Sequence, residues 1–382
     1  ARGRRIYDAD SHLMETLTWL TDHAAPGQEA LIKPLATEKG GAGVRKAIAA
    51  ADARRADAEA TRKLLEQPLI SGPKGWAAYG ASCPVERSRA LDLLGFERQL
   101  VFPTFALGQF AASRDLDVLY GGTDMLNRAM GDFCAADARL MPVGFAPLLD
   151  PKLALEAVRA GIARGISAFW LQSDPAGERS PSHLDYDPIW DLLERERIPL
   201  VLHIGGGRGL DKRYHNNGHP KVTDWLGGGE NLRGKDYHAI SHSPQNFLTA
   251  LIYDQVFQRF PELMCGVIEI GATWVPGFLR ILDQGHRAFR KAEPLLQSLE
   301  LMPSEFFRRQ VRVSLFPYED VGWLIEQAGP DVFMFASDYP HPEGGRDPIG
   351  RFDASLDLAA TPAAAREAFY HENYASLFHL SA

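Results

Sequence analysis

The sequence predicts an α/β protein with a (β/α)8 TIM-barrel fold. The chain has 382 residues, of which 45% are hydrophobic and 24% charged, so it can bury a large core and is neither disordered nor fibrous in composition. Short apolar runs rich in β-branched residues alternate along it with longer stretches of helical periodicity. We count eight such runs, and eight strands alternating with helices are typical of this barrel.

The predicted strands follow one another along the whole chain, so we expect a single domain over residues 1–382. They are 4–10, 98–103, 140–148, 165–172, 198–205, 263–271, 310–316 and 331–338. Helical periodicity lies in several of the intervals, most clearly at 150–165, 188–198, 246–260 and 274–290.

Two segments are too long to be plain connections. Residues 13–97 follow the first strand and contain a charged helical stretch at 43–67, which predicts a helical cap inserted before the second strand. Residues 205–243 follow the fifth strand, and a loop of this length is usually a lid or is disordered. Its glycines would allow movement, and Trp225 and two tyrosines would supply apolar surface, so we expect it to close over a largely hydrophobic substrate.

Composition also limits the partners. A net charge of −8 and a pI near 5.9 argue against nucleic acid and anionic membranes, which bind clustered Lys and Arg. We found neither a membrane-spanning run nor an export signal, and three scattered cysteines indicate neither a disulfide framework nor a cysteine zinc site. We therefore expect a cytoplasmic enzyme that acts on a small molecule, with a homodimer as a compatible assembly.

Ionisable residues end several of the predicted strands. Asp10 and His12 lie on one face of the first strand and are expected at the carboxyl-terminal mouth, where barrel enzymes hold their active sites. His203, Glu269 and Asp338 end the fifth, sixth and eighth strands. Each alone has an ordinary structural explanation, as a helix cap, an ion pair or a buried hydrogen bond. Together they predict a divalent-metal site of imidazoles and carboxylates.

These motifs resemble the amidohydrolase-related, metal-dependent enzymes that include aminocarboxymuconate-semialdehyde decarboxylase and γ-resorcylate decarboxylase. The resemblance covers most of the chain and is carried by "DADSH" in the first strand, "EIGATWVPGFLRILD" after the sixth and, most specifically, "ASDYPHPEG" at the eighth. It implies a (β/α)8 barrel with metal ligands at Asp10, His12, His203 and Asp338.

The chain departs from the family pattern at two places. Asp10 replaces the first His of a His-x-His motif, and Glu269 stands where the family commonly has a sixth-strand His. Gln172 ends the fourth strand without a Lys, so no carboxylated lysine is available as a bridge, and we expect Glu269 to bridge instead. His242 is a candidate further ligand or an ordinary loop His. We expect the remaining candidates to contact substrate or support the ligands, with turn formation as the alternative for the first two: His341, Glu343, Trp274 and Trp225.

The sequence therefore predicts metal-activated water attacking a carbonyl, with Zn, Fe or Mn as the ion and two ions more expected than one. Asp338 would be the general base, and His203 or His242 would donate a proton to the leaving group. We expect a hydrolase of an amide, ester, thioester or activated C–C bond. The alternatives are a metal-dependent, non-oxidative decarboxylase of an aromatic or enoic acid, and a barrel that binds metal without catalysis.

Overall fold

Eight parallel strands form the centre of the protein. The structure is a computed structural model that describes residues 3–35, 41–220 and 233–380. Its strands pair in sequence order, β1 to β8. The last strand meets the first, since the Ala9 amide donates to the Phe335 carbonyl (3.0 Å) and the Asp338 amide to the Asp10 carbonyl (2.9 Å). The strands are β1 Tyr7–Leu13, β2 Arg98–Pro103, β3 Leu140–Phe145, β4 Ala168–Trp170, β5 Leu200–His203, β6 Cys265–Ile268, β7 Val311–Ser314 and β8 Phe333–Met334.

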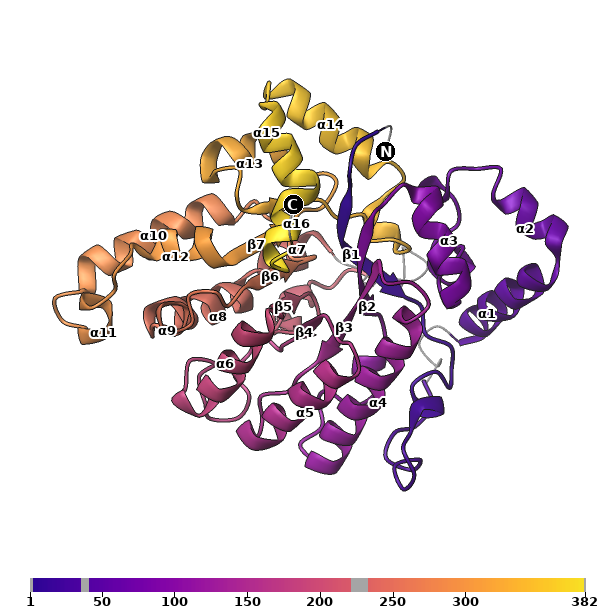
Figure 1. Cartoon of the computed structure of the whole chain (residues 1–382), viewed down its shortest axis with the longest axis horizontal. Helices are drawn as coiled ribbons and strands as arrows, with labels where there is room; N and C mark the ends of the chain where they lie inside the picture. Colours follow the sequence, from indigo (N-terminus) through magenta and orange to yellow (C-terminus); the bar gives the residue numbers. More distant parts are fainter. Residues whose placement is uncertain (1–2, 36–40, 221–232, 381–382) are drawn as a thin grey trace.

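Helices surround these strands, so the fold is the predicted (β/α)8 TIM barrel (Figure 1). Nearly every strand residue is buried, as expected for a parallel barrel that is filled inside and covered outside. The α-helices are α1 Gly41–Ala56, α2 Ala58–Leu64, α3 Pro84–Leu94, α4 Leu116–Cys134, α5 Pro151–Ala163, α6 Asp187–Glu196, α7 Gly234–Ala239, α8 His242–Tyr253, α9 Val256–Arg259, α10 Val275–Phe289, α11 Pro294–Gln297, α12 Pro303–Gln310, α13 Val321–Ala328, α14 Pro348–Leu358, α15 Ala363–Glu367 and α16 Asn373–Leu377.

Local sequence explains where several of these helices begin and end. Asp115 caps α4 and Asp150 caps α5, each accepting two backbone N–H groups of the first turn. Pro151 follows the second cap at a position where its missing N–H costs nothing. Gly95 ends α3 with φ +75°, a left-handed conformation that glycine adopts without strain.

The two long segments differ in what the structure describes. Between β1 and β2, helices α1 to α3 lie at one side of the barrel (Figure 1). The 3-10 turn η1 Thr21–His23 precedes α1, and the turns η2 Leu69–Ser71 and η3 Gly75–Ala77 lie between α2 and α3. After β5, the described residues form a 3-10 turn, η6 Lys212–His215, and the short helix α7. Trp225, expected in the lid, lies outside the described residues.

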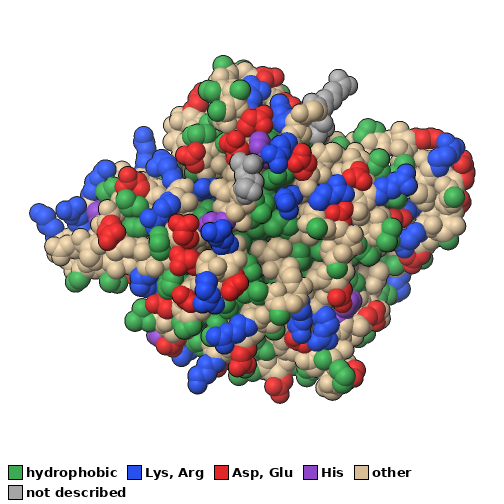
Figure 2. Space-filling view, in the orientation of Figure 1, with side chains coloured by type: hydrophobic (Ala, Val, Ile, Leu, Met, Phe, Trp, Pro, Cys, Tyr) green, Lys and Arg blue, Asp and Glu red, His purple; other side chains and the backbone are tan. Residues whose placement is uncertain are grey.

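The surface in Figure 2 carries basic and acidic side chains side by side, without a large field of one sign on that face. No helix in the described part of the chain is long and apolar enough to cross a membrane.

Candidate metal centre

The first strand supplies two side chains to the barrel mouth. Asp10 and His12 are both buried, and His12 Nε2 lies 3.3 Å from Asp10 Oδ1. The register between β1 and β2 shifts between Asp8 and Ser11, so the strand is irregular at the position of Asp10. Irregularities of this kind change the direction in which side chains point and are common beside active sites.

The ends of three further strands bring their side chains to the same place. His203 is the last residue of β5, Glu269 directly follows β6, and Asp338 lies four residues beyond β8. Glu269 and Asp338 have φ values of +54° and +49°, a left-handed conformation that costs free energy for residues other than glycine. Such backbone strain is concentrated at functional sites, where the surrounding structure holds it in place.

These side chains form one compact cluster around His12. Its Nε2 lies 3.6 Å from a carboxylate oxygen of Glu269 and 3.6 Å from one of Asp338. His203 Nε2 lies 3.2 Å from Glu269 Oε2 and 3.5 Å from Asp10 Oδ1. Two overlapping sets of ligand atoms result, each within 4.8 Å: Asp10, His12, His203 and Glu269, and His12, Glu269, Asp338 and His341.

The donor set fits a divalent ion. Asp10 Oδ1, His12 Nε2 and His203 Nε2 are buried, and none has a hydrogen-bond partner of good geometry within the described part of the chain. Buried polar atoms without partners are costly and rare, and an ion among them would satisfy all three. Imidazole and carboxylate together suit Mn, Fe or Zn.

Outer hydrogen bonds fix the histidine tautomers. His203 Nδ1 lies 2.9 Å from the Ile204 carbonyl, to which it must donate, so Nε2 keeps its lone pair for the cluster. His341 Nε2 pairs with Thr104 Oγ1 at 3.1 Å, and His341 Nδ1 lies 3.2 Å from Asp338 Oδ1. His203 is thus arranged as a ligand, with neither ring nitrogen available for the proton donation expected from sequence.

Burial shifts the acidities of the cluster. It lowers the pKa of His12 to about 3, helped by the neighbouring His341, so the ring is neutral, as a metal ligand must be. It raises the pKa of Asp338 to about 7, against the opposing effect of His341. Asp338 can therefore hold a proton near neutral pH, and a bound cation would favour its release.

A buried polar chain lies behind the cluster. Asp8 accepts hydrogen bonds from the Ser337 amide (2.7 Å), from the Ser337 hydroxyl (2.6 Å) and from Gln99 Nε2 (2.7 Å). The other end of the Gln99 amide accepts from Arg87 Nε at 2.9 Å. Arg87 Nη2 also donates to Ser11 Oγ at 2.9 Å. A carboxylate and a guanidinium, both fully buried, are thus joined through one side-chain amide.

A second support comes from Glu15, which is also buried. Its carboxylate accepts backbone N–H groups of residues 104–106 at 2.8 to 3.0 Å and so fixes the loop after β2. That loop includes Thr104, the partner of His341.

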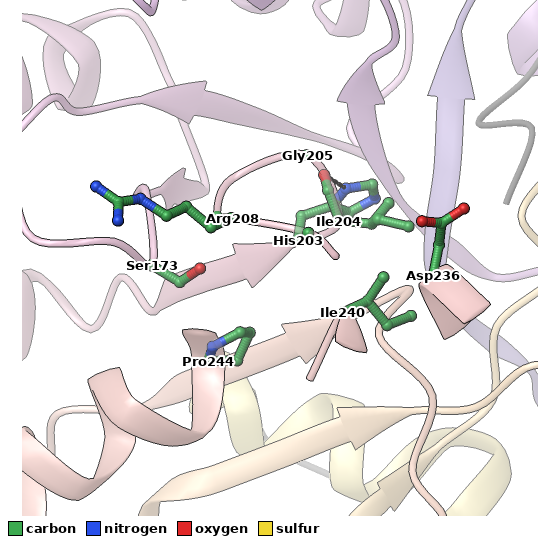
Figure 3. A pocket seen from close by; sticks show the side chains of 10 residues that line it. Ser173, His203, Ile204, Gly205, Arg208, Asp236, Ile240 and Pro244 are labelled. Atoms are coloured by element: carbon green, nitrogen blue, oxygen red, sulfur yellow. Dashed lines mark hydrogen bonds between the residues drawn. The ribbon is translucent and has the colours of Figure 1, made fainter. Parts of the chain in front are cut away.

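A pocket of about 240 Å³ adjoins the cluster at His203. Figure 3 shows His203 and Ile204 at its wall, with Ile240 and Pro244 of the α7–α8 segment beside them. Ser173 lines the pocket as well, and its buried hydroxyl has no hydrogen-bond partner within the described ranges. The pocket is large enough for a small molecule and lies next to a candidate metal ligand.

Other candidates from the sequence lie elsewhere. The structure does not bring His242 into the cluster: it is exposed in the first turn of α8, with its ring 5.2 Å from that of His238. Trp274 Nε1 donates to the Gly271 carbonyl, and its ring packs on Phe278, so it does not hydrogen-bond Glu269. Glu343 is half-buried in the turn after Asp338.

Sequence reasoning missed Arg87 and the role of Glu15. Arg87 lies in the segment predicted to be a helical cap, and no local signal marks one of its many arginines as fully buried. Glu15 was visible beside the strand-one motif, but its carboxylate contacts a loop that begins almost 90 residues later.

Comparison with known proteins agrees with this fold. A family model described as amidohydrolase matches residues 8–380. No curated protein matches the chain. An amidohydrolase from Mycobacterium avium subsp. paratuberculosis K-10 superposes with a TM-score of 0.72 at 19% identity, covering 99% of this chain and 100% of that one.

Several of the similar structures are named as decarboxylases. 5-carboxyvanillate decarboxylase from Novosphingobium aromaticivorans DSM 12444, complexed with manganese, has a TM-score of 0.64 at 18% identity, with 99% and 97% of the two chains covered. Dihydroxybenzoic acid decarboxylase from Polaromonas sp. JS666, with bound manganese, has a TM-score of 0.62 at 16% identity, with 98% and 97% covered.

Proposed function

The chain belongs to the amidohydrolase family, and we propose that within it the protein is a metal-dependent, non-oxidative decarboxylase of an aromatic or enoic acid. Hydrolysis, the first expectation from sequence, depended on two ions bridged by Glu269, with His242 as a ligand of the second. The observation that carries the proposal is that the candidate ligand atoms form a single cluster around His12 Nε2. This cluster differs from the expected site of two bridged ions, because His242 does not belong to it.

One ion suits this cluster better than two. The two possible ligand sets share His12 and Glu269, and the same His12 nitrogen faces the carboxylates of Asp10, Glu269 and Asp338. One imidazole nitrogen can bind only one ion, so two complete sets cannot be filled together. The manganese named in two similar decarboxylase structures supports Mn as the ion to test first.

The bound ion would act as a Lewis acid that orients the substrate and stabilises its developing negative charge. The rest of the reaction requires one proton. The bond between the substrate carbon and its carboxylate breaks, the electron pair stays on the carbon, and CO2 leaves. Asp338 can deliver the proton to that carbon because burial raises its pKa to about 7. His341 Nδ1 lies 3.2 Å from Asp338 Oδ1 and, in the neutral ring, has a lone pair that can accept the Asp338 proton in a hydrogen bond, since Thr104 Oγ1 donates to the Leu13 carbonyl and pairs with His341 Nε2.

A substrate panel tests the reaction class. Manganese-loaded protein is offered hydroxybenzoates beside acyl esters, thioesters and amides, with release of CO2 and of free acid measured in parallel. We expect CO2 from a hydroxybenzoate and, in D2O, one deuterium at the carbon that lost its carboxylate. Free acid from the esters or amides, without any CO2, would instead favour hydrolysis.

Replacing Asp338 tests its role as the proton carrier. Asp338→Asn keeps the shape of the side chain but cannot exchange a proton, so we expect CO2 release to fall by at least ~100-fold, a typical contribution of acid–base catalysis. Asp357→Asn is a matched control, since Asp357 is 71% exposed and pairs only with Arg366 among the ion pairs of the described residues. Equal rates for the Asp338 variant and wild type would remove Asp338 from the mechanism.

A further inference from the structure

Lys74 belongs to the segment that covers the barrel mouth near β8. It directly precedes the η3 turn, where the Gly75 amide donates to the Pro340 carbonyl at 2.9 Å. Trp76 Nε1 donates to the Glu15 carbonyl at 2.9 Å, and its ring stacks on Phe105. Backbone and side-chain contacts thus hold Lys74 against the loop that follows Asp338.

The ammonium group of Lys74 lacks hydrogen bonds. Its Nζ is buried and has no hydrogen-bond partner within the described part of the chain. It lies 5.9 Å from the centre of the Tyr339 ring, and the charged groups that act on it are Asp338, Glu343 and, unfavourably, Arg346. An ammonium removed from water without hydrogen bonds is costly, so its presence calls for an explanation.

Metal binding would increase the free-energy cost of burying the Lys74 ammonium group. Asp338 is the acid with the strongest effect on Lys74, but as a metal ligand it would share its negative charge with the ion. The cluster offers three carboxylates, Asp10, Glu269 and Asp338, so one divalent ion leaves it neutral when Asp338 holds its proton and with one negative charge when it does not. In neither state does the loaded cluster carry a net positive charge that would attract an anionic substrate, whereas Lys74 supplies a positive charge.

We propose that Lys74 binds an anionic oxygen of the substrate, a carboxylate or a phenolate, beside the metal ligand Asp338. This inference rests on the proposed function in that it takes the metal centre as the place where an organic acid binds. Lys74 Nζ, like the ligand atoms Asp10 Oδ1 and His203 Nε2, is buried without a hydrogen-bond partner within the described ranges, and Asp338 is the charged group that acts most strongly on it, so the ammonium lies on the Asp338 side of the cluster. A substrate anion supplies the missing hydrogen-bond acceptor and replaces the water lost on burial.

Binding measurements separate charge recognition from turnover. Manganese-loaded full-length protein is titrated calorimetrically with 2,6-dihydroxybenzoate, with 2-nitroresorcinol as an acidic phenol, and with resorcinol as a neutral probe. For Lys74→Met, which keeps the length of the side chain without its charge, we expect the carboxylate to bind at least about tenfold more weakly, or ~1.4 kcal/mol, while resorcinol changes by less than about twofold. Weakening of 2,6-dihydroxybenzoate alone assigns Lys74 to the carboxylate, and weakening of both acidic probes assigns it to either anionic oxygen.

Two further variants exclude a general structural effect. Lys74→Arg keeps the charge and should retain most of the preference for the acidic probes. Lys63→Met removes a lysine that is 67% exposed on α2 and should bind all probes as wild type does. Since Lys74→Met removes an ammonium without hydrogen bonds, its unfolding temperature should be equal to or higher than that of wild type.

The proposal is overturned if Lys74→Met binds the acidic probes as wild type does, if it weakens resorcinol equally, or if wild type binds neither acidic probe. Because binding is measured without turnover, a protein that binds the acids through Lys74 but releases no CO2 would disprove decarboxylation alone. A protein that releases CO2 with an unchanged affinity in Lys74→Met would disprove only the role of Lys74.

Discussion

Replacing Arg87 by Met should destabilise the protein far more than removing an arginine from the surface. The side chain is completely buried, and it donates to Gln99 Oε1 and Ser11 Oγ at 2.9 Å each. Hydrogen bonds to a charged group contribute ~1.5 to 3 kcal/mol each, so the two together contribute ~3 to 6 kcal/mol. The variant no longer buries a guanidinium, which offsets part of this contribution, and we therefore expect a loss of ~2 to 4 kcal/mol.

The coupling to Asp8 is the more specific part of this prediction. Asp8 and Arg87 do not touch but share the side-chain amide of Gln99, which donates to one and accepts from the other. Asp8→Asn removes the charge that orients this amide, so the effects of the two substitutions should not add. We expect the double variant to be at least ~1 kcal/mol more stable than the sum of the single losses predicts.

Urea unfolding of the metal-free and manganese-loaded forms measures both effects. The difference between the two forms reports metal affinity, which should fall in Arg87→Met because Arg87 Nη2 also donates to the carbonyl of Tyr339, next to the ligand Asp338. Arg195→Met is the control, since Arg195 is 61% exposed and pairs with Asp191 on α6, a pair worth less than ~1 kcal/mol. A loss below ~1 kcal/mol for Arg87→Met, or strict additivity with Asp8→Asn, would refute the reasoning.

Three further predictions concern the ion, a supporting loop and the pocket. Elemental analysis should find about one ion per chain, and the Glu269→Gln variant should bind that ion more weakly. Two ions in the native protein and one in the variant would instead support the two-ion site bridged by Glu269 that the sequence predicted. Glu15→Gln should lose ~2 kcal/mol or more in urea unfolding, because its amide would turn donors toward the backbone N–H groups of residues 104–106 or leave some of them unpaired. Gly207→Ala should raise KM more than it lowers kcat, since its Cβ would lie 2.3 Å from the hydroxyl of Ser173 and narrow the pocket; an unchanged KM would place the substrate elsewhere.

The fold was accessible from sequence because each strand is a short apolar run between helical segments. Seven of the eight runs contain the observed strand, among them 98–103, which matches β2, and 140–148, which contains β3. The first strand was placed three residues too early, since Tyr7–Leu13 is the paired segment. The eighth is only Phe333–Met334, because the chain turns into the left-handed conformation of Asp338 soon after.

The cluster was only partly accessible. Alternation on β1 and the position of strand ends suggested which side chains share the barrel mouth, and Asp10, His12, His203, Glu269 and Asp338 do lie together. The sequence did not predict the position of His242 correctly. That position depends on where the segment after residue 205 packs against the rest of the barrel, which the sequence does not show. The surface position of His242 on α8 depends on helix packing, for which local periodicity carries no information.

The segment between β1 and β2 contributes to the site rather than only covering it. Tyr339, the residue after Asp338, has two cations of this segment near its ring, Arg87 at 5.4 Å and Lys74 at 5.9 Å. Its hydroxyl donates to the carbonyl of Tyr79 in the same segment, and its own carbonyl accepts from the backbone amide of His12 at 2.8 Å. A shift of this segment would therefore be transmitted through Tyr339 to His12 and Asp338, two of the proposed metal ligands. Because the same segment carries Lys74, one part of the chain would set both the position of these proposed ligands and the charge that Lys74 is proposed to offer a substrate.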